Sequence, residues 1–294
     1  MSQSREKSFA CVCCLAELPE QRTNCNQCQA PTELSRSVSS RGTEPSFISV
    51  LGASGAGKTV YLGMLLDILS KGTRQLKGLP GSAFSVAVQQ QTLNALENRQ
   101  FPLKTPADAD SWNWIHSEIV HTARPNRTID LVTPDLAGEA VALEIEGEGA
   151  HPTIQSIVKR SSGLILLFDS QRCRDQSREE DLFAMKLATY VARQKVDERG
   201  KLRRRLKHPL AIVFTKADSC SEAADDPAEF ARSTTPSLVQ ACQRHFEQHQ
   251  FFAAGVVGSM AVAVDGFGRR MQIPLHVQPH GILEPVEWVT DRIP

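Results

Sequence analysis

Short apolar runs alternate with longer amphipathic stretches from Phe47 onward. The runs GLILLF (163–168) and LAIVF (210–214) are continuously apolar, which predicts strands that are buried on both faces of a sheet. WNWIHSEIV (112–120) alternates between apolar and polar positions, which predicts a more exposed strand in a hairpin with TIDLV (128–132). Strands that alternate with helices predict an α/β fold, with a mostly parallel sheet and helices on both faces.

The remaining elements follow from the same patterns. Further strands are expected at 47–51, 84–88 and 253–259. Pro152 and Pro236 suit first-turn positions of helices, and Gly200 suits a helix end. The expected helices span 58–70, 89–98, 152–160, 178–199, 236–249 and 281–292.

The stretch GASGAGKT, Gly52 to Thr59, lies between a predicted strand and a predicted helix. It fits the pattern GxxxxGK[ST] of a phosphate-binding loop, whose glycines let several backbone N–H groups point at one anion. Lys58 would contact the outer phosphates, and the Thr59 hydroxyl would ligate Mg²⁺. The residues expected to surround the phosphates are Gly52, Ser54, Gly55, Ala56, Gly57, Lys58 and Thr59.

The segment PDLAGE (134–139) directly follows the predicted strand TIDLV. A carboxylate at the end of a strand can hold Mg²⁺ through water, and we assign that role to Asp135. Gly138 can offer a bare backbone N–H to a γ-phosphate. Asp130 is a rival acid, but it lies inside the strand and lacks the glycine spacing, so we rank it lower.

The segment Thr215-Lys216-Ala-Asp218 follows the buried run LAIVF, at the end of a strand where open α/β sheets bind ligands. The Asp218 carboxylate can accept hydrogen bonds from N1–H and the 2-amino group of guanine. Adenine offers neither donor, so it would leave a buried charge unpaired, which costs on the order of several kcal/mol. The Lys216 stem can pack along the base, and the segment therefore favours guanine.

These motifs together resemble those of a TRAFAC-class P-loop GTPase of the Ras-like or translation-factor-like kind. The resemblance covers about residues 46–294 and implies a three-layer P-loop NTPase fold that binds GTP or GDP with Mg²⁺. The guanine motif more often begins with Asn, and Thr215 departs from that pattern. VVGSMA resembles the last guanine motif, which implies that Ser259 lies near the base.

The resemblance also implies a switch segment with a threonine before the hairpin. In FPLKTPADAD that residue is Thr105, whose hydroxyl could complete the Mg²⁺ shell or could only cap a turn before Pro106. Glu139 follows Gly138, where Ras-like GTPases usually place a glutamine that orients the attacking water. Either Glu139 takes a modified catalytic role, or hydrolysis is slow or depends on a partner.

Residues 72–110 form an insertion relative to a minimal GTPase. Together with GKTVYLGML, DLAGE, TKAD and the final GILEPVEWVTDRI, the insertion resembles the bacterial double-GTPase families. Those families are proposed to act in conflict or signalling systems, often encoded beside a second GTPase. The resemblance therefore implies a molecular switch, with a second GTPase among the candidate partners.

Five of the eight cysteines lie within the first 28 residues. Two CxxC pairs at short separation suit a tetrahedral zinc ion with four thiolates, and Cys13 is a fifth thiol that could replace a neighbour or stay free. We expect a zinc ribbon at 8–34. So short a segment cannot bury enough apolar surface to fold alone, so the metal would hold it together. A Ser- and Arg-rich stretch, 35–45, is interpreted as a linker. The expected zinc ligands are Cys11, Cys14, Cys25 and Cys28.

The charge balance is even, with 33 basic and 33 acidic residues, which argues against a chain built mainly to coat nucleic acid or a membrane. The longest apolar run, 251–264, is too short to span a bilayer, and the N-terminus lacks the apolar core of a signal peptide. We therefore expect a cytoplasmic protein. The basic run 201–208 could dock a phosphate-rich partner, so nucleic acid is not excluded, although a solvated connection is preferred.

The first functional interpretation is a GTP-binding switch that hydrolyses GTP with Mg²⁺. In it Lys58, Thr59, Gly138, Glu139 and Thr105 act at the phosphates, and a zinc ribbon recognises a protein partner. The second is a scaffold that holds GTP or GDP without useful turnover. A third is an ATPase with the same loop.

Overall fold

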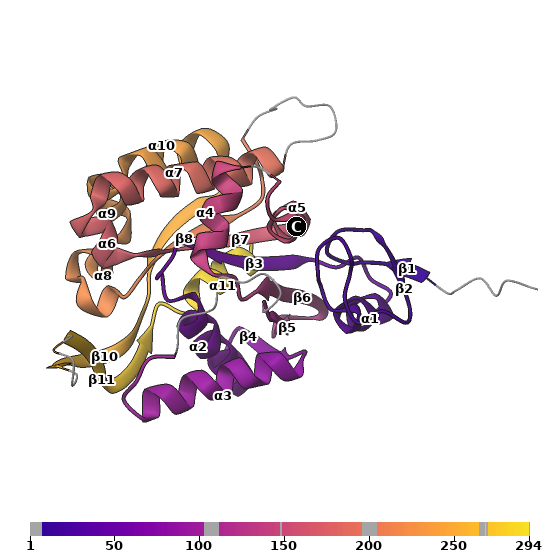
Figure 1. Ribbon diagram of the computed structural model, residues 1–294, viewed down its shortest axis with the longest axis horizontal. Coiled ribbons are helices and arrows are strands. Elements are labelled where there is room, and N and C mark those ends of the chain that lie inside the picture. Colours follow the sequence, from indigo (N-terminus) through magenta and orange to yellow (C-terminus); the bar gives the residue numbers. More distant parts are fainter. Residues whose placement is uncertain are drawn as a thin grey trace, which may run out of the picture.

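The computed structural model describes residues 8–102, 112–147, 149–195, 205–264, 268 and 270–293. Seven strands form the central sheet, in the order β4-β5-β6-β3-β7-β8-β9 (Figure 1). The strands from β6 to β9 are parallel, and β4 and β5 run antiparallel at one edge. Their bounds are β3 (Phe47–Gly52), β4 (Leu76–Pro80), β5 (Trp114–His121), β6 (Arg124–Pro134), β7 (Ser161–Asp169), β8 (Leu210–Thr215) and β9 (His249–Ala253).

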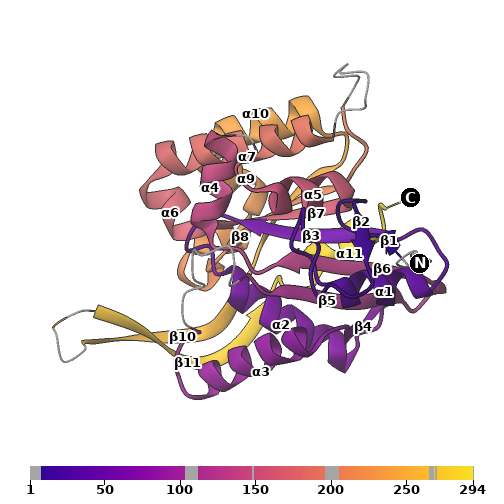
Figure 2. The ribbon, with the colours of Figure 1, turned by 45° about the vertical axis from the view of Figure 1, so that its right-hand side comes forward.

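The three central strands are buried at almost every position, as their continuously apolar sequences predict. Helices cover both faces of the sheet, with α4, α5, α7 and α10 on one side and α2 and α3 on the other (Figure 2). The three-layer, mostly parallel α/β fold is thereby confirmed. The helices here are α2 (Lys58–Lys71), α3 (Ala83–Glu97), α4 (Gly138–Glu146), α5 (Pro152–Arg160), α6 (Ser170–Asp175), α7 (Ser177–Gln194), α8 (Ser221–Asp225), α9 (Pro227–Thr234), α10 (Pro236–His245) and α11 (Glu284–Thr290).

The strand predicted at 84–88 is wrong, because this segment belongs to α3. Ser82 caps the helix by accepting the N–H of Ser85 at 3.1 Å. The buried residues of α3 are spaced by three or four positions, which is helical periodicity that the five-residue run was too short to reveal. They are Ser85, Val88, Thr92 and Leu96.

The strand predicted at 253–259 is two strands. β9 ends at Ala253 and stays in the central sheet, whereas β10 (Gly255–Val264) leaves it and pairs only with β11 (Arg270–His280) among the described residues. This hairpin projects from the body on the side opposite the N-terminal residues 8–40 (Figure 1). The helix expected at 236–249 ends at His245, and the last predicted helical residue, His249, is instead the first residue of β9.

The N-terminal module consists of β1 (Ser8–Ala10), β2 (Glu17–Pro19) and α1 (Thr32–Ser40). The interpretation of 35–45 as a linker is therefore wrong over the residues of α1, whose Leu34 and Val38 are buried. Apolar side chains of the module form one cluster with four residues of the α/β domain, so the two parts pack together. Those four residues are Phe47, Trp114, Val132 and Ile157.

In the described part of the chain, every helix is too short or too polar to cross a lipid bilayer.

Candidate functional site

The phosphate loop connects β3 to α2. Gly55 and Gly57 have φ values of 76° and 70°, a left-handed conformation that glycine adopts without strain. Gly57 is the residue before α2, so the first N–H groups of that helix face the loop. The local sequence thus builds a concave anion site at the carboxyl end of the sheet.

Lys58, Thr59 and Asp135 meet at the mouth of this loop. The Lys58 ammonium forms an ion pair with Asp135, and both groups are buried. The Thr59 hydroxyl lies 3.2 Å from each carboxylate oxygen of Asp135. Burial lowers the pKa of Lys58, and the carboxylate of Asp135 opposes that shift. A hydroxyl and a carboxylate are oxygen ligands that suit Mg²⁺, and the ammonium beside them suits a phosphate.

The start of α4 packs closely against the phosphate loop. A side chain on Gly138 would overlap the backbone of Ser54, so only glycine permits this approach. The Ser54 hydroxyl donates to Glu139 Oε1 at 2.9 Å. Glu139 is thus held on the phosphate loop itself.

At the other end of the site, the Thr215 hydroxyl donates to the carbonyl oxygens of Ala56 at 2.8 Å and Phe168 at 3.0 Å. Thr215 therefore ties the end of β8 to the phosphate loop. Lys216 has a left-handed backbone, with φ of 58°, and its ammonium lies 2.5 Å from Asp169.

Asp218 lies beside the root of the hairpin, and its carboxylate accepts the N–H groups of Val256 and Val257, both at 3.1 Å. These bonds fix the orientation of the Asp218 side chain, which borders the cavity that joins the two ends of the site.

The cavity runs from the phosphate loop to Asp218 and has a volume of about 340 Å³, which falls within the size range of small-ligand pockets. It is lined by the phosphate loop, the start of α2, the segment before α4, the end of β8 and the root of β10. Its lining includes Lys58, Thr59, Gly138, Thr215, Lys216, Asp218, Val256 and Met260.

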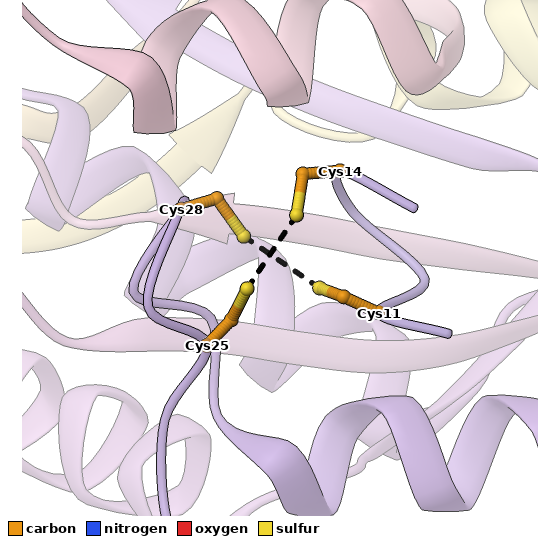
Figure 3. A group of neighbouring side chains, drawn as sticks. All are labelled: Cys11, Cys14, Cys25 and Cys28. Carbon is orange, nitrogen blue, oxygen red and sulfur yellow. Dashed lines mark hydrogen bonds between the residues drawn. The ribbon is translucent and has the colours of Figure 1, made fainter. Parts of the chain in front are cut away.

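The four predicted zinc ligands also come together. Figure 3 shows the four sulfur atoms pointing toward one another from two chain turns. Cys11 and Cys28 are 3.6 Å apart at sulfur, Cys14 and Cys25 are 3.5 Å apart, and all four atoms lie within 4.8 Å of one another. A disulfide needs about 2.05 Å, whereas tetrahedral ligands at about 2.3 Å from zinc stand roughly 3.8 Å apart. The group fits a structural zinc ion, and buried Cys13 lies outside it.

A sequence model of the Double-GTPase 2 family matches residues 46–270 of this chain. The chain belongs to the Double-GTPase 2 family. Membership identifies a GTP-binding protein with a GTPase-type fold, as the motifs predict. No curated protein matches the sequence.

Solved structures resemble this Double-GTPase 2 member at low identity. Bacterial selenocysteine-specific elongation factor EF-Sec shares 13% identity with a TM-score of 0.34, covering 70% of this chain and 25% of that one. The GTP-bound GTPase-like domain of S. cerevisiae Ski7 shares 16%, with a TM-score of 0.42 and coverage of 75% and 44%. GDP-bound Roco2 of Methanosarcina barkeri shares 14%, with a TM-score of 0.31 and coverage of 72% and 44%. This chain spans less than half the length of each.

Ser259 is a predicted site residue that does not line the cavity. Ser259 lies on β10 with an exposed side chain, and it is Val256 and Met260 of that strand that line the cavity. Thr105 falls outside the described residues. The rival acid Asp130 is fully buried within β6, opposite Phe47 of β3, where it contacts Arg41 and His116, so the lower rank given to it agrees with its position.

Sequence reasoning missed Asp169 and Arg172. Asp169 ends the buried strand β7 and accepts the N–H groups of Gln171 and Arg172 at 2.9 and 3.2 Å. The signal was present, because a carboxylate directly after GLILLF stands at the same sheet edge as Asp218. Arg172 contacts the phosphate loop, which no spacing in the sequence indicates.

Proposed function

We propose that this protein is a molecular switch that binds GTP or GDP with Mg²⁺ and hydrolyses GTP. The observation that carries the proposal is the meeting of Thr59 with the buried Lys58 and Asp135 at the mouth of the phosphate loop. Asp218 stands at the opposite end of the same cavity, so one nucleotide could contact both ends.

Each residue has a role in this proposal. Lys58 and the loop N–H groups bind the phosphates, and Thr59 and Asp135 hold Mg²⁺, which neutralises charge on the phosphate oxygens when bound. Gly138 donates its N–H to the γ-phosphate, and Asp218 accepts from the guanine edge. Thr215 acts by anchoring the loop, and the anchored Lys216 lays its stem along the base.

Exchanging the base partner tests the guanine assignment. Xanthine carries an oxygen in place of the 2-amino group of guanine, so Asp218→Asn should weaken GDP binding and strengthen binding of xanthosine diphosphate. The measurement is fluorescence titration with both nucleotides. Asp225→Asn is the matched control, because Asp225 borders the neighbouring polar groove and not this cavity. Unchanged preference in Asp218→Asn, or displacement of GDP by ATP as readily as by GTP, would overturn the guanine assignment.

A second candidate function is a scaffold that binds guanine nucleotide without useful turnover. The hydrogen bond from Ser54 to Glu139 favours it, because a carboxylate held near the γ-phosphate site repels the phosphate. Phosphate release from GTP, measured for wild type and for Glu139→Gln, separates the two. Turnover that rises in Glu139→Gln supports a slow enzyme, whereas no turnover in either protein supports the scaffold.

We further propose that the four cysteines hold zinc and that the N-terminal module or the segments around the γ-phosphate recognise a protein partner, in a cytoplasmic signalling or conflict system. The packing of the N-terminal module on the α/β domain supports the proposed partner role. The module contacts α5, which follows α4 in the chain. A second GTPase is the partner that the family's name favours. Co-purification of a tagged chain with and without GTP would test the partner.

A further inference from the structure

Arg172 contacts the outer rim of the phosphate loop from a neighbouring element. It lies on α6, and its Nη1 donates to the Ser54 carbonyl oxygen at 2.8 Å. The same nitrogen lies 3.9 Å from the position that a Cβ would take on Gly55. Ser54 is also the residue that Gly138 and Glu139 approach. The guanidinium therefore stands beside the part of the loop where the proposed γ-phosphate contacts converge.

The backbone of Arg172 is fixed while its head group stays accessible. Asp169 accepts the Arg172 N–H, and the strand that ends at Asp169 runs parallel to β3, with Leu167 opposite Gly52. The side chain is nevertheless 41% exposed, and its Nη2 pairs with the buried Glu180 of α7. A guanidinium has five N–H donors, so it can keep these contacts and still face an anion.

Among the described residues, two other cations at the site also pair with carboxylates, as Arg172 does with Glu180. Lys58 pairs with Asp135, and Lys216 pairs with Asp169. Phosphoryl transfer places negative charge on the oxygens of the moving group, and a cation preorganised beside them lowers the barrier. Arg172 adds a guanidinium at the Ser54 carbonyl oxygen of the loop, two residues before the Ala56 carbonyl that Thr215 bonds.

We propose that Arg172 is a catalytic residue supplied by this chain itself, whose guanidinium stabilises the transferring γ-phosphoryl group of GTP. The inference rests on the proposed GTP hydrolysis. No bond to Arg172 forms or breaks, because water attacks phosphorus, the bond to the GDP oxygen breaks, and inorganic phosphate and a proton are released. Glu180 is the anion that holds the guanidinium when no γ-phosphate is present.

The competing explanation is that Arg172 only braces the loop. A brace supports GDP and the transition state alike, whereas a catalytic cation acts on the transition state. In single-turnover assays, Arg172→Ala should lower GTP hydrolysis by about 100-fold or more, with GDP affinity unchanged within about twofold. It should also abolish the tight complex of GDP with aluminium fluoride, which mimics the moving phosphoryl group. Arg172→Lys should restore only part of either signal, since lysine lacks the planar fork.

Arg174→Ala is the matched control. Arg174 is on the same helix, but its guanidinium pairs with Asp175 and Glu222 rather than with the phosphate loop. Wild-type hydrolysis in Arg172→Ala would overturn the catalytic role and leave the proposed function standing, as would equal losses of GDP affinity and rate. Wild-type protein that binds no guanine nucleotide would overturn the proposed function, and this inference with it.

Discussion

Thr153 donates its hydroxyl to the carbonyl oxygen of Cys28 at 3.0 Å, so α5 touches the second cysteine pair of the N-terminal module directly. Arg160, at the other end of α5, donates to the Val12 carbonyl oxygen at 3.1 Å, next to the first pair. Glu144 of α4 accepts the N–H of His151, the residue before α5. A continuous set of contacts therefore runs from the segment beside the phosphate loop to the cysteine module.

Removing the Thr153 hydroxyl tests how much this docking stabilises the protein. Thr153→Val keeps the side-chain shape but leaves the Cys28 carbonyl without this donor, so the free energy of unfolding should fall by about 1 kcal/mol. Urea denaturation measures the change. Ser156→Ala is the control, because its hydroxyl bonds Pro152 within α5. An equal loss of unfolding free energy in both variants would show that the hydrogen bond to Cys28 does not itself stabilise the protein.

Removal of the metal should destabilise the α/β domain as well as the N-terminal module. The module packs on Phe47 and Trp114, so its unfolding would expose an apolar surface of the α/β domain. Wild-type protein should contain about one zinc ion per chain, and Cys28→Ser should lose it and unfold at a lower temperature. Elemental analysis and thermal denaturation check both expectations.

Cys13→Ser provides the comparison for the metal experiment, since Cys13 stands outside the four-sulfur group and should leave the zinc content unchanged. Wild-type protein with well under one equivalent of zinc would remove the zinc proposal.

Close packing of α2 on α3 makes Gly63 sensitive to substitution. A Cβ on Gly63 would overlap the side chain of the fully buried Thr92. Gly63→Ala should therefore lower the free energy of unfolding by roughly 1–3 kcal/mol, although alanine is the better helix former. Gly147→Ala serves as the control, because a Cβ there meets only the Leu143 carbonyl oxygen at 3.7 Å. An unchanged free energy of unfolding in Gly63→Ala would mean that α2 and α3 can move apart to admit the methyl group without loss of stability.

Sequence patterns predicted the central sheet because β7 and β8 are buried on both faces and their apolar runs leave no alternative. The motifs at the strand ends predicted Asp135 and Asp218, since loops after parallel strands meet at one edge. Sequence patterns failed where tertiary contacts decide the conformation. Ser35 in α1 is buried by the packing of the module, and β11 forms because β10 leaves the sheet. Arg172 reaches the loop across 118 positions of the chain, a contact that no local pattern encodes.

Strand β10 extends from the Asp218 end of the cavity into solvent. Met260 lines the cavity, and Val262 and Val264 follow on the same face of the strand with exposed fractions of 66% and 64%. A fluorescent label attached at position 262 would therefore sit on the outer continuation of the cavity wall without entering it. Nucleotide exchange in this protein could then be followed in real time with unmodified GTP and GDP.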